Sequence, residues 1–436
     1  MIHRAEGPGR YGYHDRFTIP LDHPSALHFY IHDLLVPHSR REMVLAAAMR
    51  TSRVAARSGW PTLGMKRVEP LAERNPAKEA NIRKFCTLLH EAGVIPEGDP
   101  SFITLDDYGE TNRGKEVIFI FGPHDERPRV VMKASSNPAH VATLAREHAT
   151  LSSVRAQVGD ALRHTIPTPM ATLSQEGWTA FAEQYLPGHS MYLETRNSFA
   201  PHGLVDRHFK LARDWLVAFQ NATCEGEARF GDRDLELSVI GPLTEYERLY
   251  QPASSERAFI AKIVSKAREF ESEQMSVVAS QGDFWARNLI LDRGGLSVLD
   301  WEGYRERGSP FFDLLLFSTS YALSYPWKLG RWSEPATAFR AAFSARSWMA
   351  KLIRGHLFNY CEISGISPKL LDVCFPAFLA QRAVEEDSHR VSCSDSGDVK
   401  DAHGGSAMRQ GVSTKGQMWR KLFQEYARMD GYAFFG

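Results

Sequence analysis

The hydrophobic pattern of this 436-residue chain changes its period twice, and these changes constrain the fold more than any other feature. Over residues 101–186, short apolar runs between turn residues predict five strands, and the stretch 138–157 between the third and fourth strands predicts a helix. From about residue 201 the spacing becomes helical, apart from a short strand–turn–strand segment at 277–304. The order β-β-β-α-β-β followed by helices predicts an α+β protein, with an antiparallel sheet followed by a mainly helical part.

We expect the chain to divide into three stretches. Residues 1–100 form a helical N-terminal extension with one helix at 39–59, residues 101–186 contain the sheet, and residues 187–436 form the helical part. The last stretch is expected to contain helices at 312–323, 337–361 and 370–391, a mobile loop near 392–412 and a terminal helix.

Spacings of three and four residues define the faces that three predicted helices bury. The expected faces are Ile82, Phe85, Cys86 and Leu89; Val141, Leu144, Ala145 and His148; and Ala212, Trp215, Leu216 and Phe219. Core packing is sufficient to explain the aromatic residues among them.

Charge and cysteine content exclude several classes of protein. Lysine plus arginine equals aspartate plus glutamate, 52 each, so the composition predicts no nucleic-acid partner. The five cysteines form no C-x-x-C pair and no zinc-ligand spacing, which indicates buried thiols in a reducing compartment. The N-terminus lacks the apolar core of a secretion signal, and no apolar run is long enough to cross a membrane. We therefore expect a soluble, cytoplasmic protein.

Polar residues with metal-binding and proton-accepting side chains gather in the segment VVASQGDFWARNLILDRGGLSVLDWEGY, residues 277–304. Asn288 begins the first strand of a predicted hairpin and Asp300 ends the second, so the hairpin brings these two residues together. Asp283 lies in the loop that leads into the hairpin, and all three side chains can face one pocket. The alternative interpretation is three unrelated loop residues that cap turns.

Two aspartates and an asparagine are the groups that phosphoryl transfer requires. One carboxylate orients the attacking hydroxyl and accepts its proton, while a second carboxylate and an amide oxygen hold Mg²⁺ against the phosphates. The catalytic task is then mainly positioning and charge neutralisation.

The same segment resembles the aminoglycoside-phosphotransferase/choline-kinase family of the protein-kinase-like fold. QGDFWARN is similar to the family's H-G-D-x-x-x-x-N loop, VLDWE to its I-D-[FW]-[ED] element and GSPFFDLLLF to its G-x-P-x-x-D-L-A segment. The resemblance covers roughly residues 100–391. It implies a two-lobed fold, with an antiparallel-sheet N-lobe and a mainly helical C-lobe, and an ATP- and Mg²⁺-dependent activity.

By this resemblance, each matching position acquires a role. Asp283 is the expected catalytic base, and Asn288 and Asp300 are the expected Mg²⁺ ligands. Lys133, at the end of the third strand, matches the family's phosphate-binding lysine, and Glu147 on the next helix matches its ion-pair partner. An exposed lysine and an ordinary helix-surface glutamate are the alternatives for these two residues.

Nucleotide contacts are expected from two further segments. Gly109 and Gly114, in the turn between the first two strands, are the candidates for a phosphate-binding loop, although this loop is sparse in glycine. The backbone of Glu183 to Tyr185 matches the family's adenine-reading hinge. The chain departs from the family at Gln281, where the motif has histidine; glutamine can donate and accept hydrogen bonds in a similar way.

Three functions are compatible with these residues. The leading one is a kinase that phosphorylates a hydroxyl of a small molecule, such as an aminoglycoside or other antibiotic, a sugar or an amino alcohol. The alternatives are a catalytically weak nucleotide-binding pseudokinase and a nucleotidyltransferase of the same fold. The acceptor and the oligomeric state stay open. Candidate liners of the acceptor pocket are Glu302, Tyr304 and the acidic run Glu385, Glu386 and Asp387, for which a solvated helix face is the alternative.

Overall fold

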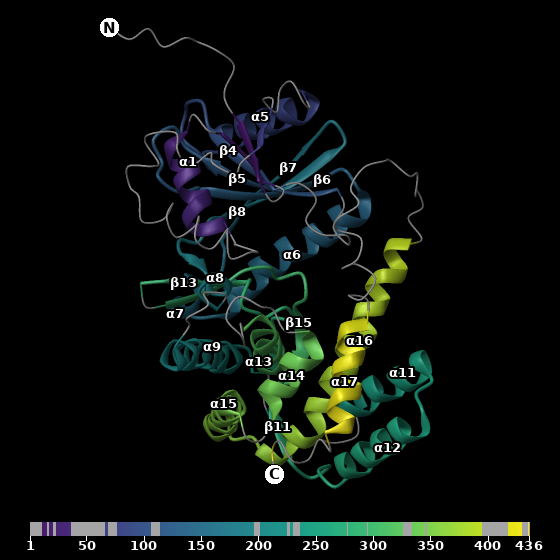
Figure 1. Ribbon diagram of the computed structural model, residues 1–436. Helices are drawn as coiled ribbons and strands as arrows, with labels where there is room; N and C mark the ends of the chain where they lie inside the picture. Colours follow the sequence, from purple (N-terminus) through teal and green to yellow (C-terminus); the bar gives the residue numbers. More distant parts are fainter. Residues whose placement is uncertain are drawn as a thin grey trace, which may run out of the picture. The chain divides into compact units, whose positions relative to one another are not determined.

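The computed structural model defines most of the chain outside its N-terminal region (Figure 1). The residues that it describes are 11–14, 17–20, 23–35, 66–68, 76–105, 114–195, 201–224, 227–229, 236–276, 278–293, 295–325, 334–344, 347–394, 417–429 and 435. The helix predicted at 39–59 lies outside these residues, as does most of the loop predicted near 392–412.

The chain folds into two compact units. Unit 1 consists of Met1–Leu193 and Leu289–Glu302, and unit 2 of Glu194–Asn288 and Gly303–Gly436. The three stretches predicted from the sequence place all of residues 187–436 in the helical part. The hairpin after Asn288 instead belongs to unit 1.

Unit 1 contains an eight-stranded antiparallel sheet in the order β3-β1-β2-β4-β5-β6-β8-β7. Its strands are β1 (Tyr11–His14), β2 (Phe17–Pro20), β3 (Lys66–Val68), β4 (Ser101–Leu105), β5 (Lys115–Phe121), β6 (Val130–Ser135), β7 (Pro169–Gln175) and β8 (Trp178–Gln184). The five strands predicted over 101–186 are confirmed as β4 to β8. The prediction that the first hundred residues form a helical extension is wrong in part, because β1, β2 and β3 extend the sheet beyond β4.

Helices cover both faces of this sheet. Helix α5 (Pro76–Glu91) packs on one face, and its predicted apolar side is buried as expected. Helix α1 (Pro24–Phe29) and the π-helical turn η1 (Tyr30–Leu34) pack on the other face. Side chains of β5 alternate accordingly, with Ile118 and Ile120 toward α5 and Phe121 toward α1.

Helix α6 (Pro138–Gln157) follows β6, with a short helix α7 (Asp160–Arg163) after it. The predicted buried face of α6 is wrong in part. Ala145 is exposed, whereas Glu147 is buried between Leu144 and Leu151 along the helix. The periodicity of apolar residues could not reveal a buried carboxylate, which depends on a partner from another element.

The predicted hairpin is confirmed as β13 (Leu289–Asp292) and β14 (Gly295–Val298). Leu289 pairs with Val298, and β9 (His189–Ser190) joins β13 from the other side. Gly188, before β9, has a φ of +129°, and a Cβ there would lie 2.3 Å from the carbonyl oxygen of Leu291. Only glycine fits this close approach.

Unit 2 is mainly helical, and helix α8 (Met191–Thr195) leads into it. Its helices are α9 (His202–Thr223), η3 (Glu236–Ile240), α11 (Gly241–Tyr250), α12 (Ser254–Arg268), α13 (Phe312–Ser324), α14 (Pro335–Phe343), α15 (Trp348–Ser364), η4 (Pro368–Leu370), α16 (Leu371–Ser394) and α17 (Met418–Arg428). Its strands are β10 (Glu227–Arg229), β11 (Gln274–Ser276), β12 (Val278–Ser280) and β15 (Arg305–Gly308). Strands β12 and β15 pair with each other, and β10 pairs with β11.

The helices predicted in unit 2 are largely present. The helices predicted at 312–323 and 370–391 correspond to α13 and α16, and the terminal helix to α17. The single helix predicted over 337–361 is instead two, because α14 ends at Phe343 and the hydroxyl of Ser347 caps α15 by accepting from the N–H of Ala350. Among the described helices, none is long and apolar enough to cross a membrane.

Candidate active site

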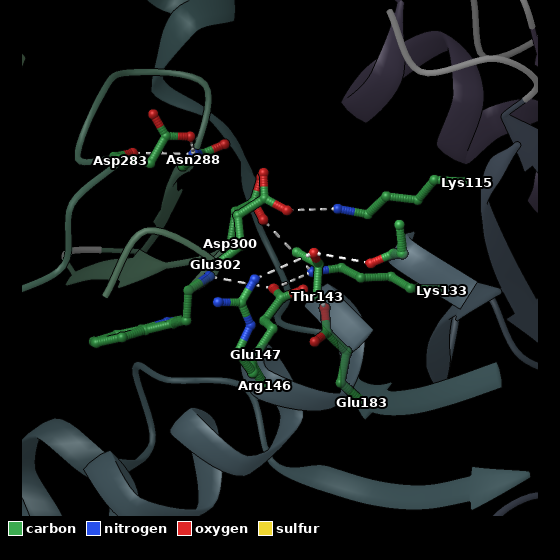
Figure 2. A network of polar contacts seen from close by, with 12 residues as sticks. Lys115, Lys133, Thr143, Arg146, Glu147, Glu183, Asp283, Asn288, Asp300 and Glu302 are labelled. Carbon is green, nitrogen blue, oxygen red and sulfur yellow. Dashed lines mark hydrogen bonds and ion pairs between the residues drawn. The ribbon is translucent and has the colours of Figure 1, made fainter. Parts of the chain in front are cut away.

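Unit 1 contains an ion-pair cluster that centres on Lys133 of β6 (Figure 2). Its ammonium group donates a hydrogen bond to Glu147 of α6. It also lies 3.6 Å from a carboxylate oxygen of Glu183 and 3.8 Å from one of Asp300. Lys133 is therefore buried, which rules out the alternative interpretation of an exposed lysine. Its ammonium group lies beside three carboxylates that come from three different parts of unit 1.

Burial perturbs the titration of this cluster. Burial raises the pKa of Glu147, and the attraction of Lys133 offsets only part of that effect. The pKa of Glu183 is raised for the same reason. Burial alone would lower the pKa of Lys133, but the three surrounding carboxylates raise it well above its usual range. The lysine is thus held in its charged form.

Asp300 has an unusual backbone conformation directly after the hairpin. Its φ is +60°, in the left-handed region that residues other than glycine rarely adopt. The next residue holds this turn in place: the N–H of Trp301 donates to Glu147 at 3.2 Å, and its indole N–H donates to the carbonyl of Val298 at 3.1 Å. Strain of this kind concentrates at functional sites.

A second lysine, which was not predicted from the sequence, belongs to the cluster. Lys115, the first residue of β5, donates to Glu302 with a distance of 2.9 Å between Nζ and Oε2. Carboxylate oxygens of Glu147, Asp300 and Glu302 all lie within 4.8 Å of one another. Oxygen donors that converge in this way suit a hard divalent cation such as Mg²⁺. The only signal for Lys115 in the sequence is its place directly after Gly114.

A separate group of candidate residues lies in unit 2, in the loop before the hairpin. The amide nitrogen of Asn288 donates to the carboxylate of Asp283 at 2.8 Å and to its backbone carbonyl at 3.0 Å. The indole N–H of Trp285 donates to the same carboxylate oxygen at 3.3 Å. Since the amide nitrogen of Asn288 is engaged by Asp283, its amide oxygen is the atom available as a metal ligand.

A buried aspartate on α13 holds the start of this loop. Asp313 accepts from the backbone N–H of Gln281 at 2.7 Å and from that of Gly282 at 2.9 Å. Burial raises the pKa of Asp313, although both N–H groups act in the opposite direction. The side chain of Gln281 in turn accepts from the N–H of Asp283 at 3.0 Å. The backbone on either side of Gly282 is therefore fixed by side chains.

Apolar packing anchors the same loop. Phe284 is fully buried and stacks on Trp215 of α9, with ring centroids 5.5 Å apart. The four residues of the predicted apolar stripe of α9 are all buried. That stripe is core packing, as expected, and it also supports the loop that carries Asp283.

The two segments that were expected to contact the nucleotide are the glycine loop and the hinge. Gly109 lies outside them, and Gly114 has a φ of +86°. Glu183 lies within β8 and directs its side chain to Lys133, while the backbone N–H of Tyr185 donates to the carbonyl of Arg129 at 3.2 Å. The predicted hinge backbone is therefore partly engaged within the sheet.

The acidic run on α16 makes internal contacts and is not a solvated helix face. Glu385 accepts hydrogen bonds from Arg305 and from Arg382. Glu386 accepts from the backbone N–H of Trp419 at 3.2 Å, and burial together with the carboxylate of Asp387 raises the pKa of Tyr250. These carboxylates connect elements of unit 2, which weakens the case for them as binding groups for a cationic acceptor.

The lysine–glutamate pair and Asp300 in unit 1, and the Asp283–Asn288 loop in unit 2, are the residues on which the family resemblance rests. A model of the phosphotransferase enzyme family matches residues 109–352, more than half of the chain. The chain therefore belongs to this family. No curated protein matches the chain in sequence.

The solved structures that resemble the chain include small-molecule kinases. A thermostable mutant of aminoglycoside phosphotransferase APH(4)-Ia, in its apo form, is 14% identical with a TM-score of 0.44, over 79% of this chain and 98% of that one. Amicoumacin kinase hAmiN, in complex with AMP-PNP, Ca²⁺ and Ami, is 9% identical with a TM-score of 0.43, over 80% and 96%. Glucosamine kinase is 13% identical with a TM-score of 0.40, over 77% and 95%.

Proposed function

We propose that this chain transfers the γ-phosphoryl group of ATP to a hydroxyl of a small molecule in the presence of Mg²⁺. The observation that carries the proposal is the ion-pair cluster of Lys133, Glu147 and Asp300 in unit 1. A structural ion pair would need one carboxylate, whereas this ammonium group is surrounded by three. Lys115 and Glu302 complete the cluster, in which four carboxylates face two ammonium groups, and this surplus of negative charge favours the binding of a further cation.

In this proposal, Lys133 binds phosphate oxygens of ATP, and Glu147 keeps the lysine charged and in position. Asp300 and the amide oxygen of Asn288 hold Mg²⁺, for which their oxygen atoms are suitable ligands. When bound, Mg²⁺ neutralises charge that develops on the phosphoryl oxygens.

Asp283 is the proposed general base. It orients the acceptor hydroxyl and takes its proton as the new O–P bond forms. Hydrogen bonds from Asn288 and Trp285 to one oxygen of its carboxylate restrict the side chain to a single orientation. Preorganisation of this kind reduces the entropic cost of the transition state.

The pseudokinase alternative loses support from the contacts of Gln281. This residue replaces the family's histidine, yet its side chain accepts from the N–H of Asp283 and its own N–H donates to Asp313. The loop backbone is thus held without an imidazole, so the glutamine provides a structural reason for activity to persist.

A thermal-shift screen identifies the acceptor class. The screen uses Mg²⁺, ATP and a panel of aminoglycosides, other antibiotics, sugars and amino alcohols. A ligand that binds only the folded chain raises the melting temperature by mass action.

Mass spectrometry of the product then tests the reaction. Phosphoryl transfer adds about 80 Da to the acceptor, and nucleotidyl transfer adds about 329 Da, the masses of the groups that ATP donates. The proposal expects the smaller addition, and expects the Asp283→Asn variant to form the product far more slowly. The larger addition would establish the nucleotidyltransferase alternative, and the absence of any product with bound ATP would establish the pseudokinase.

A further inference from the structure

Lys115 is a charged residue for which the proposed reaction has no use. Its side chain is only 7% exposed, and its ammonium group contacts Glu302. Burial alone would lower its pKa, but the carboxylates of Asp300 and Glu302 raise it, so the group remains charged. Val117 pairs with Lys133 across β5 and β6, and residues 115 and 117 share one face of a strand. Both lysines therefore project from the same face of the sheet.

Carboxylates outnumber lysines in the cluster beside this face of the sheet (Figure 2). Lys133 forms ion pairs with Glu147, Glu183 and Asp300, whereas Lys115 forms an ion pair with Glu302. With every group ionised, four carboxylates face two ammonium groups. The side chain of Glu302 is the most exposed of the four, at 31%. It is thus the carboxylate that can change partner with the least rearrangement.

We propose that Lys115 controls when Glu302 becomes available to a divalent cation. The inference rests on the proposed function and adds a positioning residue to it. In the absence of nucleotide, Lys115 neutralises Glu302 and lowers the affinity of the neighbouring carboxylates for a free divalent cation. Phosphate oxygens of an incoming nucleotide offer Lys115 a second anionic partner, which releases Glu302 toward the cation. Metal binding is thereby coupled to nucleotide binding.

A purely structural ion pair makes a different prediction. Removal of a structural lysine lowers stability and leaves metal affinity unchanged or weaker. Removal of a lysine that suppresses metal binding tightens it, because a positive charge beside the carboxylates is lost. The direction of the change in metal affinity therefore separates the two roles.

The test measures binding of Mn²⁺ to the nucleotide-free full chain by electron paramagnetic resonance. The variant is Lys115→Met, and the matched control is Lys78→Met. Lys78 also forms an ion pair at 2.9 Å, with Glu116, the next residue of β5, which points to the other face of the strand. We expect Lys115→Met to bind Mn²⁺ at least about tenfold more tightly than the wild type. Lys78→Met and the charge-conserving Lys115→Arg should bind like the wild type.

Two further measurements complete the test. Lys115→Met should bind metal-free ADP more weakly than the wild type, and addition of Glu302→Gln should reverse the gain in Mn²⁺ affinity. Lys115→Gln, which retains a donor to Glu302, replaces the methionine variant if that variant does not fold.

The inference is overturned if a folded Lys115 variant without the charge binds Mn²⁺ no more tightly than the wild type, or if Glu302→Gln leaves the gain intact. Absence of ATP binding to the wild type would instead remove the proposed function itself. The two failures are therefore distinguishable.

Discussion

Gly282 is the position where the structure predicts the sharpest effect of adding a single methyl group. Its φ is +85°, and a Cβ there would lie 1.8 Å from the backbone carbonyl oxygen of Gly303. The obstacle is backbone, which cannot rotate away. Gly282 also lies between Gln281 and Asp283, so relief of the clash must move the loop that carries the proposed base.

The expected cost of Gly282→Ala has two parts. A left-handed conformation costs a residue with a Cβ about 1–2 kcal/mol, and overpacking typically adds about 1–3 kcal/mol. Gly177 provides the matched control, because its φ is +82° and nothing lies within 4 Å of the added Cβ. Gly177→Ala should therefore cost only the conformational part, about 1–2 kcal/mol. The difference between the variants isolates the close approach.

Urea unfolding and steady-state turnover test this prediction together. We expect Gly282→Ala to lose about 2–5 kcal/mol of unfolding free energy. Its kcat should fall by about 10², the effect of a displacement near 1 Å at a reacting group. Gly177→Ala should retain wild-type kcat. Equal stability losses and equal kcat values for the two variants would refute the assignment of Gly282 to a tight catalytic turn.

Two other predictions concern single carboxylates. Asp283→Asn should leave ATP affinity nearly unchanged and lower kcat by about 10²–10⁴, the usual contribution of a general base; a loss of ATP binding in calorimetry would show that the residue instead holds the metal. Arg382 and Arg305 hold the pKa of Glu385 below its ordinary value despite its burial, so the ionised form stabilises the fold above the unfolded-state pKa of about 4.3. The gap in melting temperature between the wild type and Glu385→Gln should therefore be full near neutral pH and close as the pH falls through the folded-state pKa; a gap independent of pH would contradict this assignment.

Local patterns in the sequence were sufficient to predict strands β4 to β8 and the loop before the hairpin. The strands β4 to β8 have clear alternating patterns and turn residues, and the spacing of Asp283 and Asn288 identifies the loop that the structure shows hydrogen-bonded. The strands β1 to β3 escaped prediction because they are only three or four residues long. Pairing with the rest of the sheet stabilises them, and their sequences carry no comparable signal.

The electrostatic network was predicted only in part: the family resemblance implied the pair of Lys133 and Glu147, which the structure contains, but not the pairing of Lys115 with Glu302. The apolar pattern of α6 did not indicate that Glu147 is buried, because its burial depends on Lys133 from strand β6. Lys115 and Glu302 are 187 residues apart, and only the fold brings them together. Asp313 is the aspartate of GSPFFDLLLF, the segment that resembles a family motif, but the sequence does not show that it accepts hydrogen bonds from two N–H groups of the loop.

Calorimetric titration of ATP into the full chain, with Mg²⁺ and with EDTA, tests the central claim most directly. The account predicts that the wild type binds ATP and that Mg²⁺ tightens the binding. It also predicts that Asp300→Ala loses this Mg²⁺-dependent gain, because the cation loses its main anionic ligand. Absence of heat at millimolar ATP in both conditions, or an Asp300→Ala variant that keeps the full effect of Mg²⁺, would contradict it.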